Sequence, residues 1–448
     1  MEHLDSTVLA TALPVMARDL GEDPIALKLA LTAYLLSLAI FIPLSGWAAD
    51  KFGARRVFRA SLVIFVLGSI LCAFSNSLAT IVAARIVQGL GGAMMVPVGR
   101  LVVLRTAPRH ELVQAMSWLA IPALIGPAIG PPFGGLLATY AHWRYIFWIN
   151  VPIGLLGVAL ASRYIPDLIE PQPRPLDAPG ALLSGVGLCG LVFGFTIGGR
   201  GLVAPPMVAL ILCVGGLALA AYVRHARQTT YPILDLKMLR IPTFRAAILG
   251  GFLFRVGLGA APFLLPLLLQ EGFRLTALQS GLLTFAGAVG AIAMKTTAQP
   301  IINRFGFRSV LIVNGLISAA FLYGYAFFTS TTAHMTILLV ILVGGFFRSL
   351  QFTALNAIAF ADIAPGDMSN ATSFAAVGQQ LALSTGVAIG AGALEAAREL
   401  HGGGQLVASD FAPAFCVVAT ITALSPIIFR SLPPTAGDIL TNRGGPRF

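Results

Sequence analysis

AADKFGARRVF, at residues 48–58, and IINRFGFRSVL, at residues 301–311, are short charged segments that each lie between long apolar stretches. Both contain a basic residue followed by Phe, Gly, one variable residue and Arg. Three such pairs of similar segments, called echoes below, are separated by nearly the same number of residues, which predicts two parallel halves. Such a repeat is typical of transporters, whose substrate site lies between the halves. The other two echoes are Arg85-Ile-Val-Gln88 with Arg348-Ser-Leu-Gln351, and Ala107-Pro108 with Ala364-Pro365.

The composition indicates a membrane protein with many spans. Of the 448 residues, 57% are hydrophobic and 10% are charged, whereas soluble domains carry about 25% charged residues. A net charge of +11 would suggest nucleic acid as a partner of a soluble protein. Here the basic residues lie in short loops, where they set membrane orientation, so we expect no nucleic-acid partner. The four cysteines lie in apolar stretches and lack the spacing of a disulfide framework or a metal site.

Fourteen apolar stretches are candidate spans, the first of them incomplete. Since a helix satisfies its backbone polar groups within lipid, we expect an all-α polytopic membrane protein. The stretches are Leu4–Met16, Leu29–Ala49, Val57–Phe74, Leu78–Val98, Leu112–Tyr140, Tyr145–Tyr164, Gly180–Ile197, Val203–Val223, Thr243–Leu269, Leu278–Thr297, Ser309–Phe328, Met335–Ala361, Thr372–Ala397 and Phe411–Phe429.

The spans divide the chain into four parts. We expect an N-terminal six-helix bundle at residues 1–166, with its first helix truncated, and two inserted helices with their loops at 167–240. A C-terminal six-helix bundle follows at 241–432, and a cytoplasmic tail at 433–448. The positive-inside rule puts the most basic loops, such as residues 51–59, in the cytoplasm, together with both termini of the complete protein. About 8–14 residues of the first helix then precede Met1, which indicates a misplaced start codon or a truncated chain.

Five motifs, in the right order, resemble those of the major facilitator superfamily, and in particular its 14-spanner drug:proton antiporter family of the EmrB/QacA type. Within that family, MMVPVGR, VRHAR and the region of Arg255 are similar to the MdtD-like group of multidrug transporters. The motifs are LDSTVLATALP (4–14), GWAADKFGARR (46–56), RIVQGLGGAMMVPVGR (85–100), GPAIGPPFGG (126–135) and HWRYIFWINVPIG (142–154).

The loop motif is implied by this resemblance to be a conformational latch, which holds the two bundles together in one state and releases them in the other. Its glycines allow a tight turn and close helix approach. Ala54 stands where the family usually has a basic residue, and in the echo Asn303 replaces the acid, so the second latch is expected to be weaker. A basic turn that only fixes topology is the alternative. The predicted latch residues are Gly46, Asp50, Gly53, Arg55 and Arg56.

The motif at 126–135 resembles the family's antiporter motif, which the resemblance associates with export. Its prolines remove backbone hydrogen bonds and bend a helix. Its glycines recur every four residues and clear one helix face, which also serves simple helix packing. The residues that carry the prediction are Gly126, Gly130, Pro131, Gly134 and Gly135.

Ionisable residues inside spans are the candidate functional groups, because each costs at least about 2.5–3.5 kcal/mol at mid-membrane and faces a cavity or a partner. Asp5 and Arg85 lie at depths that let them pair, since both helices run from the same membrane face. Burial raises the pKa of a carboxyl group and a nearby cation lowers it. We therefore predict that Asp5 carries the coupled proton and that Arg85 tunes it; a purely structural pair is the alternative.

The remaining ionisable residues divide into two groups. Arg255 and Arg348 lie in mid-span of the second half without an evident acid, and we expect Arg255, Arg348, Gln88 and Gln351 to line a substrate cavity. Arg348 has a structural alternative, because it echoes Arg85. A cavity arginine favours anionic or zwitterionic solutes. Near span ends, Arg100, Lys295 and Glu395 are expected to reach the membrane interface.

The sequence thus predicts a proton-coupled efflux transporter that exports a small amphipathic solute or drug by alternating access. A proton symporter or facilitator for a small metabolite is one alternative, since the fold does not fix direction. A non-transporting membrane sensor or scaffold is another. We find no catalytic constellation, and expect no enzyme activity, no metal and no cofactor besides the proton gradient. The expected protein is a monomer in the bacterial inner membrane, with protons and a small molecule as its partners.

Overall fold

The computed structural model describes residues 5, 8–9, 15–16, 18–21, 24–119, 126, 130, 142–166, 169, 173–198, 204–402 and 406–441. Every regular element within these residues is a helix, so the all-α prediction is confirmed. Twelve described helices are long and apolar enough to cross a membrane. They match twelve of the fourteen predicted stretches. Most of the first stretch and most of 112–140 lie outside the described residues, so the count of fourteen stays a prediction.

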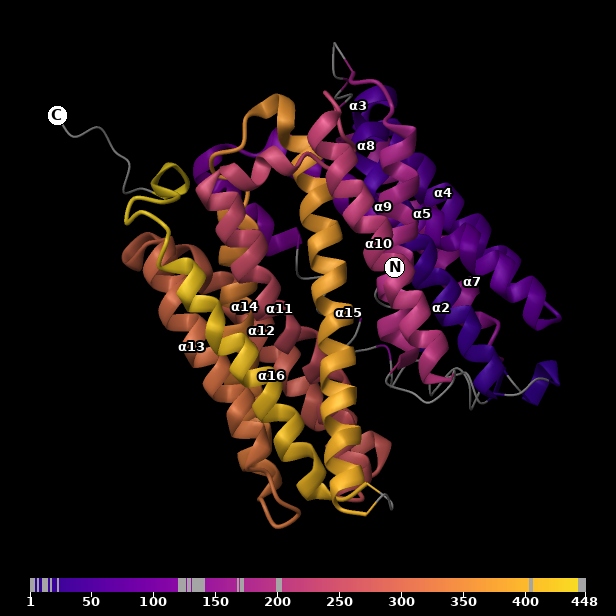
Figure 1. Ribbon diagram of the computed structural model, residues 1–448, viewed down its shortest axis with the longest axis vertical. Helices are drawn as coiled ribbons and strands as arrows, with labels where there is room; N and C mark the ends of the chain where they lie inside the picture. The colour runs from indigo at the N-terminus through magenta and orange to yellow at the C-terminus, as the bar shows by residue number, and fades with distance from the viewer. Residues whose placement is uncertain are drawn as a thin grey trace.

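In chain order, the elements fall within the predicted first half, insertion and second half, a division that stays a prediction (Figure 1). The first half contains helical residues at 5, 8–9, 15–16, 18–20 and 112–119, then α2 Pro24–Phe41, η1 Ile42–Leu44, α3 Ser45–Phe52, α4 Ala54–Ala73, α5 Leu78–Thr106, η2 Arg109–Glu111, α7 Tyr145–Trp148 and α8 Asn150–Tyr164. The insertion contains α9 Ala178–Gly198, α10 Pro205–Gln228 and η3 Leu236–Arg240. The second half contains α11 Pro242–Leu267, the π-helical turn η4 Leu268–Gly272, α12 Ala277–Phe305, α13 Phe307–Ala326, α14 His334–Ile358, η5 Pro365–Asp367, α15 Met368–Leu400, α16 Ala408–Phe429 and η6 Asp438–Leu440.

Local sequence signals set where several spans begin. Ser77 caps α5 by accepting a hydrogen bond from the backbone N–H of Thr80 at 3.3 Å, and Thr276 caps α12 in the same way through Gln279 at 3.2 Å. Such side chains satisfy donors that a helix start leaves unpaired. Proline occupies the first turn of α10 and α11, where a missing N–H costs nothing.

The two echoed loops adopt the same backbone turn. Gly53 joins α3 to α4 with φ +88° and ψ 134°, and Gly306 joins α12 to α13 with φ +76° and ψ 157°. Side chains other than glycine rarely adopt such a positive φ. The helices that follow, α4 and α13, both have 20 residues and both end at a phenylalanine with φ −92°. The sequence echo is therefore a repeat of local structure.

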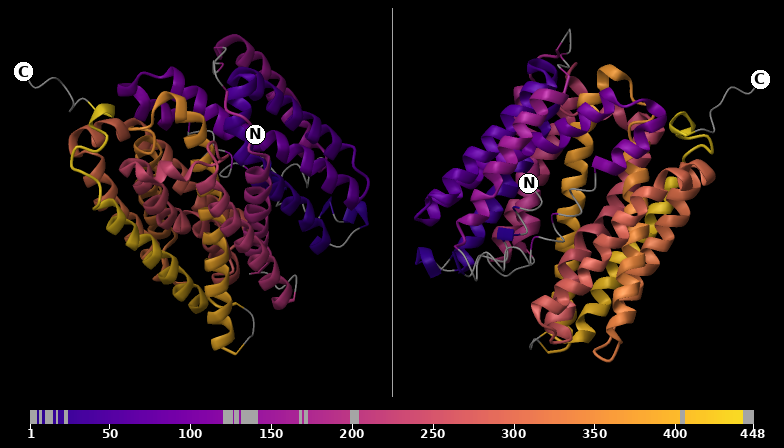
Figure 2. Two further views of the ribbon diagram at one scale, coloured as in Figure 1. Left: turned by 45° about the horizontal axis from the view of Figure 1, so that its top comes forward. Right: turned by 180° about the vertical axis from the view of Figure 1, so that it is seen from behind.

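The two halves form separate bundles that meet at one end and diverge toward the other (Figures 1 and 2). The joined end, which contains the α3–α4 turn, is called the latch end below. There α15 packs against α3, η1 and α5. Gly46 donates its backbone N–H to Ser373 Oγ at 2.8 Å, and Ser45 Oγ lies 2.8 Å from the same hydroxyl. These contacts hold the two halves together.

A shared hydrophobic cluster also closes the latch end. It combines buried residues of α3 and α5, such as Ala49 and Leu101, with residues of α11 and α14, such as Phe254 and Leu355. Ala436 and Leu440, beyond α16, are buried in it too, so the start of the predicted tail packs on the fold. The inserted α9 packs against both α2 and α15, and α10 packs on α9. The insertion therefore touches both halves.

We predict that Gly46→Ala opens the latch end. A Cβ at Gly46 would lie 2.4 Å from the Ser369 carbonyl oxygen and 2.7 Å from Ser373 Oγ, so the two bundles must separate. The distance between spin labels at Lys51 and Gly366, measured by pulsed electron paramagnetic resonance, should lengthen. Gly216→Ala in α10 is the matched control, because a Cβ there meets nothing within 4 Å. Unchanged distances in Gly46→Ala would show that this contact does not hold the bundles together.

Candidate functional site

A buried ion pair lies inside the N-terminal bundle. Arg85 of α5 donates from Nη1 to Asp5 Oδ2, and both side chains have 0% exposure. The same Nη1 donates to Gln88 Oε1 at 2.6 Å, and Nε donates to the Ala30 carbonyl oxygen at 3.3 Å. The guanidinium carbon lies 4.3 Å from the ring centroid of Tyr34. The structure thus brings together Asp5 and Arg85, as predicted from the sequence.

Two side-chain amides complete the contacts of the Asp5 carboxylate. Gln88 Nε2 and Asn150 Nδ2 each donate to Asp5 Oδ1 at 3.0 Å. Both amides also donate to Ser69 Oγ, at 2.7 Å and 3.2 Å. Donors from α5 and α8 therefore surround a carboxylate that only accepts hydrogen bonds. We call Asp5, Ser69, Arg85, Gln88 and Asn150 the Asp5 network.

The Asp5 network holds unused hydrogen-bonding groups. Within the described part of the chain, Arg85 Nη2 and Asn150 Oδ1 are buried without a partner. An unpaired buried polar atom costs about 1–3 kcal/mol, so the network is incompletely satisfied in this conformation. Asn150 is the first residue of α8, directly after the break that ends α7. A change at Asn150 therefore bears on the packing of a whole helix.

Sequence reasoning missed Ser69 and Asn150. Asn150 lies in the quoted stretch at 142–154, but a lone amide in an apolar span does not reveal its partner. Ser69 resembles any small helix-packing residue. The structure places Gln88, expected in a substrate cavity, inside the Asp5 network, with 0% exposure.

The start of the 142–154 stretch forms a clamp at the end opposite the latch. Trp143 Nε1 donates to Asp19 Oδ2 at 2.8 Å, and Arg144 Nη1 donates to the same oxygen at 3.0 Å. Arg144 also donates to the Ser75 carbonyl oxygen and to Asn76 Oδ1, at 3.1 Å and 3.0 Å. The clamp ties the first helical segment to the α4–α5 loop. The indole hydrogen bond, with help from Arg144, lowers the pKa of the Asp19 carboxyl.

Two of the predicted latch residues, Gly46 and Asp50, contact the second half. Arg105 Nη2 donates to Asp50 Oδ1 at 2.9 Å, and Ser369 Oγ at the start of α15 donates to Asp50 Oδ2. Arg55 donates from Nη2 to the Ser162 carbonyl oxygen at the end of α8. Arg56 is exposed, and Ala54 is fully buried, so its lack of charge suits its site. Asp50 therefore links α3, α5 and α15 in this conformation.

The family of this chain follows from its similarity to known proteins. The profile of the Major Facilitator Superfamily matches residues 1–387 and 247–446. The chain belongs to the major facilitator superfamily. It is 36% identical over 436 residues to the multidrug resistance proteins MdtD of Salmonella typhimurium and Salmonella typhi, covering 97% of this chain and 92% of each relative. The predicted MdtD-like group is confirmed. The protein is a multi-pass membrane transporter of a small molecule and not an enzyme.

Solved structures of other transporters share the fold of this chain. The human organic anion transporter MFSD10 (TETRAN) superposes with a TM-score of 0.66 and 15% identity, over 95% of this chain and 96% of that one. The proton:xylose symporter XylE, bound to 6-bromo-6-deoxy-D-glucose, gives a TM-score of 0.66 and 15% identity, over 97% and 94%. At this identity the likeness establishes the fold and not the cargo.

The predicted antiporter helix is only partly described. Gly126 and Gly130 are helical and buried. Pro131, Gly134 and Gly135 lie outside the described residues. The helix bend that the prolines of residues 126–135 predict therefore stays a prediction.

The remaining cavity candidates lie in different surroundings. Gln351 is fully buried within the second bundle, where its Oε1 accepts from Asn314 at 2.9 Å and its Nε2 donates to the Leu311 carbonyl oxygen at 3.0 Å. Arg348 is half-buried on the same helix. Arg255 is buried, and its Nη2 donates to Asn356 Oδ1 at 3.4 Å. Gln351 thus has its partners inside one bundle, whereas Arg255 has long, weak contacts.

Two of the three residues expected at the membrane interface are buried instead. Glu395 is 47% exposed and pairs with Arg398 at 3.2 Å, as a residue near the interface should. Arg100 and Lys295 are buried, with 5% and 8% exposure. Lys295 Nζ donates to Thr353 Oγ1 at 2.6 Å. Their positions in the sequence suggested an interface because the packing of α14 and α15 over them was not evident there.

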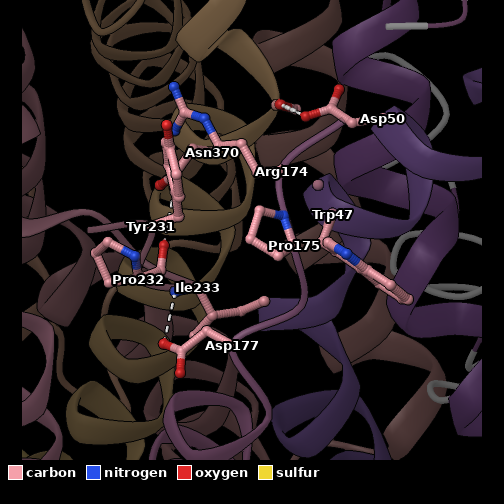
Figure 3. Close-up of a pocket in the computed structure, with 11 residues that line it drawn as sticks. Trp47, Asp50, Arg174, Pro175, Asp177, Tyr231, Pro232, Ile233 and Asn370 are labelled. Carbon is pink, nitrogen blue, oxygen red and sulfur yellow. Dashed lines mark hydrogen bonds between the residues drawn. The ribbon is translucent and has the colours of Figure 1, made fainter. Parts of the chain in front are cut away.

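A small pocket lies at the latch end (Figure 3). Asp50 and Trp47 of α3 face Asn370 of α15 across it, together with Arg174 and Tyr231 from the segments on either side of α9 and α10. Its volume of about 30 Å³ holds a water molecule or two but not a drug-sized solute. The described residues contain no group of His, Cys, Asp and Glu that could hold a metal ion. The pocket is too small to be the transport site.

We predict that the contribution of Asp19 to stability disappears in acid. Because its folded-state pKa is lowered, its stabilising effect is complete above the unfolded pKa of about 3.9 and is lost as the pH falls through the lower folded value. Asp19→Asn should therefore reduce the thermal unfolding temperature at pH 5–8 by a constant amount, and the difference from the unmodified protein should shrink below about pH 4. A difference that grows on acidification would contradict the clamp.

Proposed function

We propose that the protein exports a small solute across the bacterial inner membrane, by alternating access and in exchange for a proton. The observation that carries this proposal is the fully buried Asp5–Arg85 pair, which lies in the bundle that also bears the latch residue Asp50. Removing one partner of a buried pair costs about 3–5 kcal/mol. Neutralising Asp5 with a proton therefore has enough energetic consequence to bias the conformation of the bundle.

The geometry supports a route by which a proton changes helix contacts. A neutral Asp5 no longer attracts Arg85 and gains one O–H donor. Asn150 Oδ1 is a buried acceptor without a partner in the described residues, beside the oxygen to which Asn150 Nδ2 now donates. If the side-chain amide of Asn150 rotates, its Oδ1 accepts the hydrogen bond from the new O–H. Since Asn150 begins α8, the change is transmitted to a helix that packs on α4.

Alternating access requires the latch end to open. The positive-inside rule supports a cytoplasmic location for this end, which carries Lys51, Arg55 and Arg56. In this conformation the cytoplasmic end is then closed, and Asp50 must leave Ser369 for cargo to enter. The proton gradient is the proposed energy source: about 2.3 kcal/mol per 100 mV and about 1.4 kcal/mol per pH unit sustain roughly a thousandfold gradient of cargo. No other cofactor and no partner protein is part of the proposal.

Export is favoured over uptake by two observations. The stretch at 126–135 resembles the antiporter motif, and the relatives MdtD are named as multidrug resistance proteins. Proton symport, facilitated uptake and a sensor without transport remain outcomes that the experiment separates.

We predict that Asp5→Asn abolishes proton-driven export. Inside-out membrane vesicles with an imposed pH gradient should accumulate members of a panel of amphipathic drugs and small carboxylates when they carry the unmodified protein. Asp5→Asn vesicles should bind the same compounds but not accumulate them, because the neutral amide cannot take up a proton.

Glu399→Gln is the control for loss of a carboxylate, since Glu399 is exposed at the end of α15. Uphill accumulation by Asp5→Asn would remove Asp5 from the mechanism. Compound loss from such vesicles when the gradient is imposed would indicate symport, and absence of any gradient-dependent flux would favour a sensor.

A further inference from the structure

Two segments that flank the inserted helices meet at the latch end. Residues 173–177 lead into α9, and residues 231–235 follow α10. Arg174 of the first segment lies near Tyr231 of the second (Figure 3), and its guanidinium carbon is 5.8 Å from the tyrosine ring centroid. We call the two segments together the strap.

A buried carboxylate holds the two segments of the strap to each other. The side chain of Asp177 is only 3% exposed, and its Oδ2 accepts from the backbone N–H of Ile233 at 3.1 Å (Figure 3). His225 Nε2, near the end of α10, lies 2.7 Å from Asp177 Oδ1. The hydroxyl of Tyr222 donates to the Leu234 carbonyl oxygen at 2.7 Å and accepts from the Leu234 N–H at 2.8 Å. The strap is therefore fixed firmly to the insertion.

The insertion that carries the strap packs on the first half through apolar contacts. Ile233 and Leu234 of the strap belong to one buried cluster with Tyr34 and Leu38 of α2 and Leu188 of α9. This cluster also includes residues of α15, and α9 packs against both α2 and α15. The strap is thus positioned between the two halves.

The strap also makes polar contacts with the second half, at the start of α15. Arg174 Nη2 donates to Asp367 Oδ1 of η5. Asp235 donates its backbone N–H to Asn370 Oδ1 at 3.0 Å, and Asn370 Nδ2 donates to the Pro232 carbonyl oxygen at 3.4 Å. Both ends of the Asn370 amide therefore bind the backbone of the strap.

The start of α15 is held from two sides as a result. Ser369 donates to Asp50 of α3, while its neighbours Asp367 and Asn370 bind the strap. The small pocket at the latch end lies between the strap and α3 (Figure 3). Because these contacts come from adjacent residues, α15 cannot leave Asp50 unless the insertion also loses a contact with one of the halves.

The echo of the latch loop, at residues 301–311, makes its hydrogen bonds within its own half. Asn303, which replaces the acid of the first loop, accepts from Gln299 of the same helix at 2.9 Å. Arg308 donates to the Arg430 carbonyl oxygen, just after α16, at 3.1 Å. These contacts do not join the second half to the first, whereas those of Asp50 do.

We propose that the strap is the second latch of this protein and takes the place of the one that the echo would supply. Hydrogen bonds weaken steeply when their geometry is disturbed, whereas packed helices slide past each other by small amounts. The contacts of Arg174 and Asn370 with the strap's partners therefore break when the latch end opens, and the insertion stays with α2 of the first half. This inference rests on the alternating access of the proposed function.

The first test measures opening of the purified full-length protein in lipid nanodiscs, without cargo. Spin labels at Lys51 of α3 and Ser309 of α13, both exposed, report the distance across the latch end. Asn370→Ala removes both amide contacts, so the fraction of open molecules should rise about twofold to tenfold, the usual effect of one or two hydrogen bonds on an equilibrium. Asn303→Ala is the matched control, because the partner of Asn303 is on its own helix, and it should leave the distances unchanged.

The second test prevents the strap from releasing. In a protein whose native cysteines are replaced by alanine, a short bifunctional methanethiosulfonate joins Arg174→Cys to Asp367→Cys, at positions that are both partly exposed. Gradient-driven accumulation in inside-out vesicles should be lost on crosslinking and should return when dithiothreitol cleaves the link. Arg174→Cys joined to Tyr231→Cys is the control, since both positions belong to the strap, and it should retain accumulation.

Unchanged distances in Asn370→Ala, or equal opening in Asn303→Ala, would overturn the strap as a latch. Accumulation that survives the link between Arg174→Cys and Asp367→Cys would overturn it too, because these contacts would then not need to break. Size-exclusion profiles identify a variant that fails to fold, and Arg174→Gln, at a partly exposed position, then carries the distance comparison. If the unmodified protein accumulates no compound, the transport proposal fails, and the distances still decide whether the strap holds the latch end.

Discussion

The energetic cost of a charge inside a membrane is the constraint on which the structure depends. Each buried ionisable group needs a partner or a wet cavity, because a charge at mid-membrane costs at least about 2.5–3.5 kcal/mol. Asp5 and Arg85 satisfy each other, and two amides and one hydroxyl surround them. Helices that carry such a network cannot slide independently. The same constraint makes a change in protonation an efficient signal, since it removes a charge that several side chains are arranged to accommodate.

Close packing of small residues keeps this network in register. A Cβ at Gly68 would lie 2.6 Å from Gln88 Cα, and one at Gly91 would lie 2.6 Å from the backbone nitrogen of Phe65. A Cβ at Gly89 would lie 2.5 Å from Ser37 Cβ. In lipid, where helices gain little from hydrophobic burial, such contacts supply much of the association between helices. Helices α2, α4 and α5 therefore pack as one unit.

Much of the architecture could be predicted from the sequence, because the length and apolar character of a span are local properties. The twelve described spans and the paired turns at Gly53 and Gly306 follow from local patterns. The pairing of Asp5 with Arg85 could be predicted as well, from depth in the membrane and the rarity of charge there. What joins Asn150 to Ser69 could not, because the contact spans 81 residues and neither residue carries a periodic signal.

Burial near span ends was the least predictable feature for a similar reason. Arg100 is six residues from the end of α5, and a side chain in that position on a lone helix would extend to the membrane surface. In the protein, α15 crosses this region and the residues after α16 pack beside it. Only the tertiary arrangement shows that the guanidinium is enclosed. The position of α9 against both α2 and α15 is a second case, because chain order alone places it between the halves but not on them.

The arginines of α5 suggest how events at separate depths are linked. Arg85, Arg100 and Arg105 lie along about 30 Å of one helix. The first pairs with the proposed proton carrier, the last with the latch carboxylate of α3, and the middle one faces the second half with few partners. Since α5 packs closely against α2 and α4, the proposed mechanism has a displacement at Arg85 move the other two arginines as well. In the proposed mechanism, proton binding near Arg85 and latch release near Arg105 need no chain of intermediate side chains, because both residues belong to one helix.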